Sequence, residues 1–251
     1  MSVRIETIGS AILYQADALD VLPLLRERSF VGLITDPPYS SGGAFKGDRS
    51  APTSSKYQSS ENRGIYPEFQ GDTRDQHSYL AWLTLWLSRA RCLVVPGALG
   101  CVFTDWRQLP TTTDALQAAG WVWRGIVPWD KTERGRPQQG RYRAQAEYIV
   151  WGTDGARPLQ GPTAPGVLRL PVPRQKHHIA GKPVALMEGL MIPMDTGPIL
   201  DPFMGSGTVG LACQAQGRPY VGIEVDATYF EIACRRLQEG LNGASSGAAA
   251  G

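Results

Sequence analysis

Hydrophobic positions along this chain follow two periods in turn, and the alternation predicts strands interleaved with helices. Short apolar runs bounded by glycine or polar residues predict seven strands, at residues 11–16, 31–35, 97–106, 121–129, 146–152, 198–203 and 219–225. Apolar residues at helical spacing predict helices at residues 20–28, 78–94, 110–120, 182–194, 207–217 and 227–241. We therefore expect an α/β fold: a doubly wound, mostly parallel seven-stranded sheet with helices on both faces and ligands at the carboxyl ends of its strands.

We expect residues 1–241 to form one domain, in which two segments do not follow the alternation, and residues 242–251 to form a tail. Residues 40–75 are rich in serine, glycine, arginine and aromatic residues, and so long a connection predicts a functional lid or a docking surface. A disordered insertion is the alternative. Residues 131–176 contain KTERGRPQQGRYR and a proline-rich run, with too little periodicity for a core element. The small residues of 242–251 predict a disordered tail.

Composition limits the classes of protein that remain. With 251 residues, 42% of them hydrophobic and 19% charged, the chain can bury one sizeable core. It has no apolar run long enough for a membrane span, and its first residues lack a secretory signal, so we expect a cytoplasmic protein. The four cysteines are isolated and the three histidines are scattered, which favours buried thiols over a metal site.

The net charge of +2 conceals a segregation of charge along the chain. Between Arg124 and Lys182 there are eleven lysines or arginines against four acidic residues, which leaves 14 basic and 19 acidic residues elsewhere. A basic segment on an otherwise acidic chain is what binding to a polyanion requires. We therefore expect residues 131–176 to form the surface that meets the polyanion.

The first motif with chemical potential is DPPY, Asp36 to Tyr39, which follows a predicted strand directly. Pro37 and Pro38 remove two backbone donors and fix the direction of the chain, so a carbonyl and a carboxylate are held rigidly at the rim of an opening. Asp36 as a turn cap and Tyr39 as a core residue are the structural alternatives. The conjunction of strand, carboxylate, diproline and aromatic residue favours a functional site.

The second motif is ILDPFMGSGTVG, in which a strand delivers Asp201 to a glycine-rich turn. Gly205 and Gly207 permit close approach of the backbone to a ligand, and Thr208 opens a helix whose N-terminus can face an anion. About twenty residues later Glu224 ends the next strand, where a carboxylate can accept both hydroxyls of a ribose. The pair predicts an adenosine-containing ligand. A purely structural turn or a dinucleotide-binding enzyme remains as an alternative.

Together the two motifs resemble those of the S-adenosylmethionine-dependent DNA amino-methyltransferases. Because DPPY precedes DPFMGSGT, with HHIAGKPVALMEGLM just before the latter, the order is similar to that of the β class. The segments DPPYSSGGAFKGD and FTDWRQLPTTTDALQAAG look most like the orphan adenine-N6 enzymes of phages and prophages. The resemblance implies a Rossmann-like methyltransferase fold, S-adenosylmethionine as cofactor, double-stranded DNA as substrate, and a homodimer.

The resemblance also implies roles for individual residues. Asp36 and the carbonyl of Pro37 accept N–H groups of the target amine, Pro38 helps to lock that carbonyl, and Tyr39 stacks on a base flipped out of the duplex. The implied cofactor-binding residues are Asp17, Ala18, Asp36, Lys182, Asp201, Phe203, Gly205, Ser206, Gly207, Thr208 and Glu224. Asp17 as a helix N-cap and Lys182 as a surface charge are the structural alternatives. The segments around Trp129, Glu147 and Tyr148 resemble the lining of a base pocket but are equally consistent with packing.

Several functions remain open from the sequence. The first is methylation of DNA at adenine N6 or at cytosine N4. Aspartate before the diproline favours adenine N6, whereas serine or threonine there would favour cytosine N4. Methylation of RNA or of a protein glutamine is disfavoured, because such enzymes usually carry asparagine in place of Asp36. A silent DNA-binding subunit is disfavoured by the intact motifs, and a dinucleotide oxidoreductase leaves the diproline unexplained.

Overall fold

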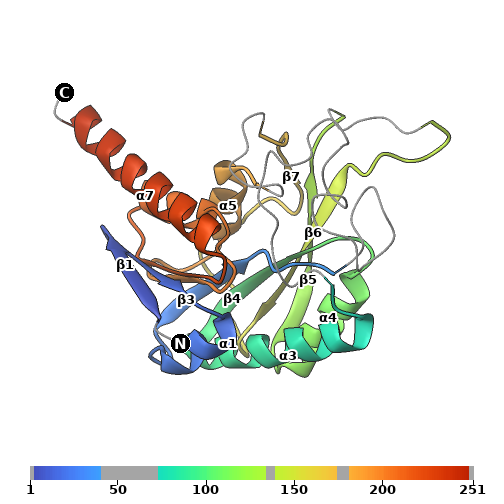
Figure 1. The fold of residues 1–251 in the computed structure, drawn as a ribbon. Coiled ribbons are helices and arrows are strands. Elements are labelled where there is room, and N and C mark those ends of the chain that lie inside the picture. The colour runs from blue at the N-terminus through green and yellow to red at the C-terminus, as the bar shows by residue number, and fades with distance from the viewer. Residues whose placement is uncertain (1–2, 41–72, 134–138, 174–180, 249–251) are drawn as a thin grey trace.

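A sheet runs through the middle of the molecule in the computed structural model, which describes residues 3–40, 73–133, 139–173 and 181–248 (Figure 1). In these residues the sheet has nine strands in the order β1-β2-β9-β8-β3-β4-β6-β5-β7. The strands are β1 (Arg4–Ile8), β2 (Ala11–Gln15), β3 (Phe30–Thr35), β4 (Val94–Thr104), β5 (Val122–Asp130), β6 (Ala146–Thr153), β7 (Leu168–Arg169), β8 (Ile199–Asp201) and β9 (Tyr220–Glu224).

The middle of the sheet is parallel, as the sequence predicts. Strands β2, β9, β8, β3 and β4 pair in parallel with their neighbours, with Leu33 opposite Leu200 and Gly100. Strands β1 and β6 add antiparallel pairs outside this group, β5 pairs antiparallel with β6, and β7 pairs in parallel with β5. The carboxyl ends of the five parallel strands therefore meet at one edge of the sheet, where ligands bind in such folds.

The prediction of seven strands is wrong in number, because β1 and β7 do not show in the hydrophobic pattern. Strand β1 has the mixed sequence RIETI and is held by antiparallel pairing with β2 across a short turn at Gly9, whose φ is +58°. Strand β7 has only two residues and lies in the segment expected to lack core elements. It forms because Leu168 is buried in the core and pairs with Trp129 of β5.

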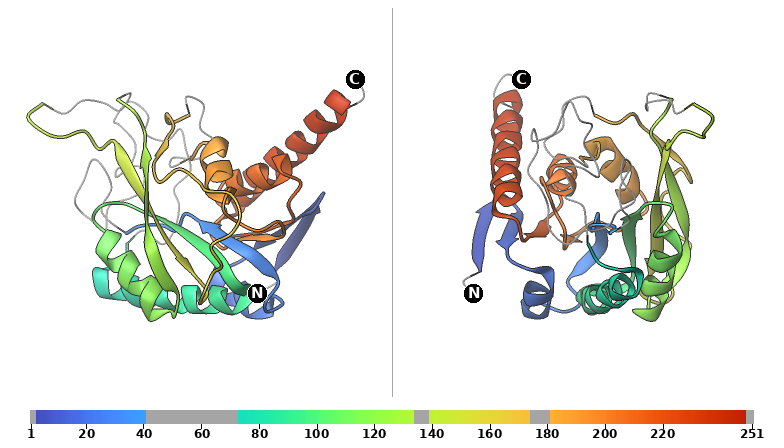
Figure 2. Two further views of the ribbon diagram at one scale, coloured as in Figure 1. Left: turned by 180° about the vertical axis from the view of Figure 1, so that it is seen from behind. Right: turned by 45° about the vertical axis from the view of Figure 1, so that its right-hand side comes forward.

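Helices cover both faces of the sheet, as expected (Figure 2). On one face lie α1 (Ala18–Val21) with the following 3₁₀ turn η1 (Leu22–Leu24), α3 (Gln76–Leu93) and α4 (Leu109–Ala118). On the other lie α5 (Val184–Met191), α6 (Thr208–Ala215) and α7 (Ala227–Ala248). Each face has its own hydrophobic core: Trp86 and Leu87 belong to the first, and Leu186 and Phe230 to the second. Burial of these apolar side chains provides the main stabilisation of the layers.

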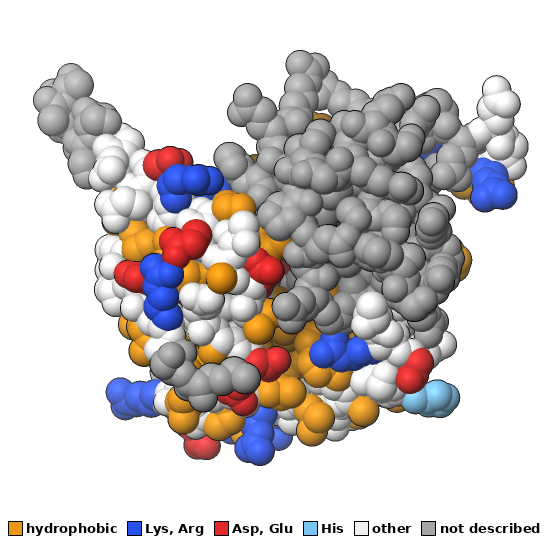
Figure 3. All heavy atoms as spheres, viewed as in Figure 1, with side chains coloured by type: hydrophobic (Ala, Val, Ile, Leu, Met, Phe, Trp, Pro, Cys, Tyr) orange, Lys and Arg blue, Asp and Glu red, His pale blue; other side chains and the backbone are white. Residues whose placement is uncertain are grey.

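The prediction of a disordered tail at residues 242–251 is wrong for most of its length. Helix α7 continues to Ala248 and extends away from the body of the molecule (Figure 1). Residues 242–248 contain two alanines beside two glycines and two serines, so their intrinsic propensity does not favour a helix, and they prolong one that the core has already nucleated. Figure 3 shows acidic and basic side chains beside one another below the free end of α7. In the described residues, Arg4 of β1 pairs with Glu6 and with Glu231 of α7.

Some predictions concern residues that the structure does not describe. Most of the predicted lid or docking surface at 40–75 lies at residues 41–72, outside the described ranges, as do 134–138 and 174–180. None of the helices in the described ranges is long and apolar enough to span a membrane. Within the same ranges, no cluster of histidine, cysteine, aspartate or glutamate side chains is arranged to hold a metal ion.

Candidate active site

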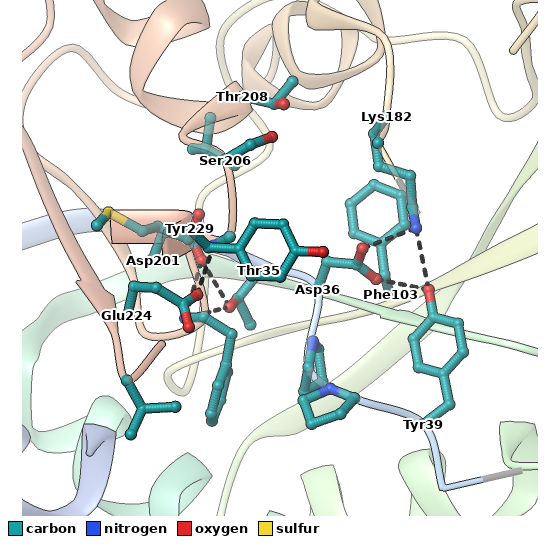
Figure 4. Close-up of a pocket in the computed structure, with 18 of the residues that line it drawn as sticks. Thr35, Asp36, Tyr39, Phe103, Lys182, Asp201, Ser206, Thr208, Glu224 and Tyr229 are labelled. Atoms are coloured by element: carbon teal, nitrogen blue, oxygen red, sulfur yellow. Dashed lines mark hydrogen bonds and ion pairs between the residues drawn. The ribbon is translucent and has the colours of Figure 1, made fainter. Parts of the chain in front are cut away.

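A cavity of about 230 Å³ opens at the carboxyl ends of the parallel strands (Figure 4). Its lining comes from both sequence motifs, from the loop before α5 and from the start of α3. Of the residues predicted for the site, it includes Asp17, Asp36, Pro37, Pro38, Tyr39, Lys182, Asp201, Phe203, Gly205, Ser206, Thr208 and Glu224. Two segments of chain about 165 residues apart in sequence thus form one pocket because β3 and β8 are neighbours in the sheet.

Thr35 joins the two motifs. Its Oγ1 donates to Asp201 Oδ1 at 2.7 Å and accepts from the backbone N–H of Phe203 at 3.2 Å. Asp201 Oδ1 also accepts from the N–H of Phe203, and its Oδ2 accepts from the Tyr220 hydroxyl at 3.3 Å. Burial raises the pKa of Asp201 to about 7 despite these donors. Asp201 therefore holds the glycine-rich turn in shape at the end of β8.

The glycine-rich turn is held from two further sides. Gly205 donates its N–H to Glu224 Oε2 at 2.9 Å, and Arg236 of α7 donates to the Ser206 hydroxyl at 2.9 Å and to the Ser206 carbonyl. Gly207 is the N-cap of α6 and has φ +78°, a left-handed conformation that favours glycine. Thr208 then begins the helix, as predicted. The N-terminus of α6 consequently faces the cavity with its backbone in a fixed conformation.

Glu224 lies at the end of β9, where the sequence places a ribose-binding carboxylate. Its Oε1 accepts from the N–H of Asp226 at 2.8 Å, in addition to the bond from Gly205. Burial raises its pKa to about 7, and the two backbone donors oppose that rise. Each oxygen retains a lone pair for a ligand hydroxyl, because a carboxylate oxygen can accept two hydrogen bonds.

The neighbouring end of the cavity is aromatic. Phe203 lies with its ring centroid 5.2 Å from that of Trp82 on α3, and the Arg74 guanidinium stacks on Trp82 at 4.2 Å. Asp17 also lines this part of the cavity, and its Oδ1 caps α1 by accepting from Leu19 N at 2.8 Å. Asp17 is therefore the N-cap of α1, as the structural alternative predicted, and it also lines the cavity. Ala18 is buried behind it and does not line the cavity.

The DPPY segment forms the other end of the cavity. Both oxygens of Asp36 accept hydrogen bonds: Oδ1 from the Tyr39 hydroxyl at 2.6 Å and Oδ2 from the Lys182 ammonium at 2.7 Å (Figure 4). Burial raises the pKa of Asp36, whereas Lys182 and Tyr39 lower it. Lys182 is no surface charge, because its side chain is only 5% exposed. In this structure it contacts the catalytic motif, although the resemblance assigns it to the cofactor.

Sequence reasoning left out one charged residue of this end. Glu147, at the start of β6, accepts from Lys182 at 3.0 Å and from Lys131 at 2.6 Å, and the Tyr39 hydroxyl lies 3.3 Å away. Burial opposes its ionisation, but the two lysines lower the pKa of Glu147 to about 2. Asp36 and Glu147 in turn raise the pKa of Lys182 against the effect of its burial. The sequence did contain a signal for Glu147, because it is an acidic residue at the start of an otherwise apolar strand.

Other lining residues gave no such signal in the sequence. Trp82 falls on the amphipathic pattern of α3 like any core residue, Arg74 precedes that helix, and Tyr229 lies in the first turn of α7. Thr35 reads as an ordinary strand residue. Only the packing of α3 and α7 around the carboxyl ends of the strands brings these side chains to the cavity.

The expected basic surface at 131–176 stays a prediction, because four of its nine basic residues, at 134, 136, 174 and 176, lie outside the described ranges. Among the described ones, Lys131 pairs with Glu147, Arg157 binds Asp195 and the carbonyls of Gly97 and Pro193, and Arg169 pairs with Asp130 and Glu133. Each of these three cations therefore compensates a nearby acidic residue. Arg141 and Arg143 flank a fully exposed Tyr142 in the connection between β5 and β6, and Arg143 donates to the Glu133 carbonyl.

The family described as DNA methylase, of the N6/N4 type, matches residues 32–164 and 160–235, a span that includes both motifs. The chain belongs to the N6/N4 DNA methylase family. The type II methyltransferase M2.LlaDCHI of Lactococcus lactis subsp. cremoris is 23% identical over 252 residues, which cover 92% of this chain and 90% of the relative.

Solved structures agree with this assignment. The complex of M1.HpyAVI with S-adenosylmethionine is 25% identical, with a TM-score of 0.64, and the match covers 90% of this chain and 99% of that one. The cytosine-N4-specific PvuII DNA methyltransferase shares the fold, with a TM-score of 0.70 at 15% identity over 94% of this chain and 93% of that one. This DNA methylase is therefore a DNA methyltransferase, and its cofactor is S-adenosylmethionine.

The residues of the cavity fit that cofactor. A carboxylate with free lone pairs, Glu224, lies next to the aromatic end formed by Phe203 and Trp82, which matches a ribose joined to a flat purine. The glycine-rich turn and the N-terminus of α6 offer backbone N–H groups nearby. The DPPY segment lies at the opposite end of the cavity.

Proposed function

We propose that this DNA methylase transfers the methyl group to the exocyclic N6 amine of adenine in double-stranded DNA. The observation that supports it is the Asp36 carboxylate, held at the end of β3 with both oxygens in the cavity wall beside the cofactor site. S-adenosylmethionine supplies an electrophilic methyl group when it is bound. The chain's own task is to present the amine to that methyl group.

The amine of adenine is a poor nucleophile because its lone pair is delocalised into the ring. Asp36 and the Pro37 carbonyl accept its two N–H groups, which draws electron density onto nitrogen and aims the lone pair into the cavity. Pro37 and Pro38 keep these acceptors in place with little reorganisation. Tyr39 provides the aromatic ring against which a flipped base stacks.

Contacts with DNA are proposed for the exposed connection between β5 and β6. Arg141 and Arg143 carry two positive charges on either side of the exposed aromatic ring of Tyr142, a combination suited to phosphates and bases. This connection extends from the same side of the sheet as the carboxyl end of β5 (Figure 1). The target sequence and a homodimer stay predictions.

The proposed reaction is tested with labelled S-adenosylmethionine and unmethylated genomic DNA, followed by digestion to nucleosides and mass spectrometry. We expect N6-methyladenine as the product, and mapping of the modified positions then yields the target sequence. N4-methylcytosine would keep the mechanism and change the base. Absence of label in DNA, with the cofactor still bound in calorimetry, would contradict the proposal.

Cofactor affinity is expected to weaken as the pH falls from 8 to 6. Glu224 has a pKa raised to about 7 by burial, so it takes up a proton in this range and loses acceptor strength toward the ribose hydroxyls. The decline should approach about tenfold per pH unit below the pKa at most. Calorimetric titration of S-adenosylmethionine at several pH values measures it. Glu224→Gln should bind more weakly and with a flatter pH dependence; an unchanged slope would exclude Glu224 as its source.

A further inference from the structure

Two lysines and two carboxylates alternate in a row that begins outside the cavity and ends in its wall, where Lys182 and Asp36 line it. Lys131 contacts Glu147 at 2.6 Å, Glu147 contacts Lys182 at 3.0 Å, and Lys182 contacts Asp36 at 2.7 Å. The Lys182 ammonium also lies 5.3 Å from the ring centroid of Phe103 and 5.9 Å from that of Trp129. Charges so poorly solvated stay ionised only when each is compensated by its neighbours.

Glu147 reaches this place from a rigid part of the sheet. Strand β6 is paired on both sides, with β4 and with β5, and Glu147 is the register partner of Trp129. Lys131 follows directly after β5, so its ammonium and the Glu147 carboxylate are held by adjoining strands. The strand that carries Glu147 therefore belongs to neither sequence motif, although the carboxylate itself lies 3.3 Å from the Tyr39 hydroxyl of DPPY.

The contacts of Asp36 conflict with its proposed role. One of its oxygens accepts from Tyr39 and the other from Lys182, and the second is at the short distance typical of a charge-assisted bond. Each oxygen retains a lone pair for a target amine, but the amine then donates to a carboxylate whose negative charge this ammonium already balances, which weakens the acceptor. An ammonium with no second carboxylate close by would hold Asp36 more firmly, because separation would leave a desolvated charge uncompensated.

We propose that Glu147 is a positioning residue that takes over the Lys182 ammonium from Asp36 when the target base enters, and so restores the full acceptor strength of the Asp36 carboxylate toward the amine. This inference rests on the proposed amino-methyltransferase function. Lys182 Nζ already lies within hydrogen-bond distance of both carboxylates, so a small shift of the ammonium between them suffices. Lys131 keeps Glu147 ionised and fixed in its strand environment for that exchange.

The test measures how strongly the protein prefers a target base that carries its exocyclic amine. Fluorescence anisotropy compares two duplexes without cofactor at pH 8: one with the mapped target base, and one with the same base lacking the amine, purine for adenine or 2-pyrimidinone for cytosine. A hydrogen bond from the amine to a charged acceptor predicts a preference of about tenfold or more in the wild type. We expect Glu147→Gln to reduce that preference to about threefold or less.

The decisive variant removes the competing ammonium as well. Glu147→Gln combined with Lys182→Met should restore the preference for the amine toward the wild-type value, which a merely structural role of Glu147 would not do. Glu147→Asp should retain part of the preference. Glu6→Gln removes the same charge from a surface ion pair of β1 and should change nothing.

The outcomes separate this inference from the proposed function. Full retention of the preference in Glu147→Gln, or a double variant no better than the single one, would overturn the role of Glu147. Melting temperatures of all variants identify any loss caused by unfolding. Failure of the wild type to methylate DNA would instead overturn the proposed function itself, whatever the variants do.

Discussion

Asp36→Ala is expected to reduce methyl transfer to DNA by about a thousandfold or more while cofactor affinity changes by no more than about threefold. The variant removes the carboxylate that accepts from Tyr39 and Lys182 and leaves the glycine-rich turn, Glu224 and the aromatic end of the cavity unchanged. Lys182 retains Glu147 as a carboxylate partner, so its charge stays compensated. Single-turnover methylation assays and calorimetry measure the two quantities separately.

The matched control for this variant is Asp36→Asn. Asparagine has the shape of aspartate and one carbonyl acceptor, but no charge, so activity should fall less than in the alanine variant. Loss of cofactor binding together with activity in Asp36→Ala would show that the two ends of the cavity have been assigned wrongly. Equal activities of the alanine variant and the wild type would exclude Asp36 from the reaction.

Gly207→Ala is expected to weaken cofactor binding by about tenfold or more and to lower the free energy of unfolding by roughly 1 to 3 kcal/mol. Gly207 has φ +78°, and a Cβ there would lie 3.1 Å from the Ala233 Cβ and 3.3 Å from its Cα on α7. The turn from Gly205 to Thr208 has to shift to relieve this contact. Chemical denaturation and calorimetry of S-adenosylmethionine binding provide the measurement.

Gly217→Ala is a suitable control because it separates backbone strain from crowding. Gly217 follows α6, has φ +64°, and has no atom within 4 Å of a Cβ placed there. This variant should lose about 1 kcal/mol through strain alone and bind the cofactor as the wild type does. Equal loss of cofactor affinity in both glycine variants would show that general destabilisation, and not the shape of the turn, controls binding.

Asp201 and Thr35 illustrate how the two motifs depend on each other. The buried Asp201 carboxylate accepts hydrogen bonds from Thr35, from the N–H of Phe203 and from Tyr220. These bonds fix the backbone that forms this end of the cavity. The contacts of Asp201 are all with the protein, and they support the glycine-rich turn. Strand β3, which leads into DPPY, and strand β8, which leads into the glycine-rich turn, are thus joined by a hydrogen bond as well as by backbone pairing.

The sequence by itself determined the larger part of the architecture. Apolar runs identified the strands that carry Asp36, Asp201 and Glu224, because the core of a parallel sheet requires continuous apolar residues. The rule that ligands meet the carboxyl ends of such strands then placed both motifs at one edge. Glycine and proline indicate the local backbone conformation by themselves, so the turn at Gly207 and the start of α6 could be predicted without knowledge of any tertiary contact.

Tertiary structure alone decided the charges around Asp36. Glu147 lies on β6, Lys131 follows β5 and Lys182 precedes α5, and only the order β3-β4-β6-β5 in the sheet brings them to one place. Sequence reasoning had assigned Lys131 to a basic surface and left Glu147 aside. A pattern along the chain records which side chains are buried, but the partner of a buried charge is chosen by strand order and register, which depend on the packing of the whole domain.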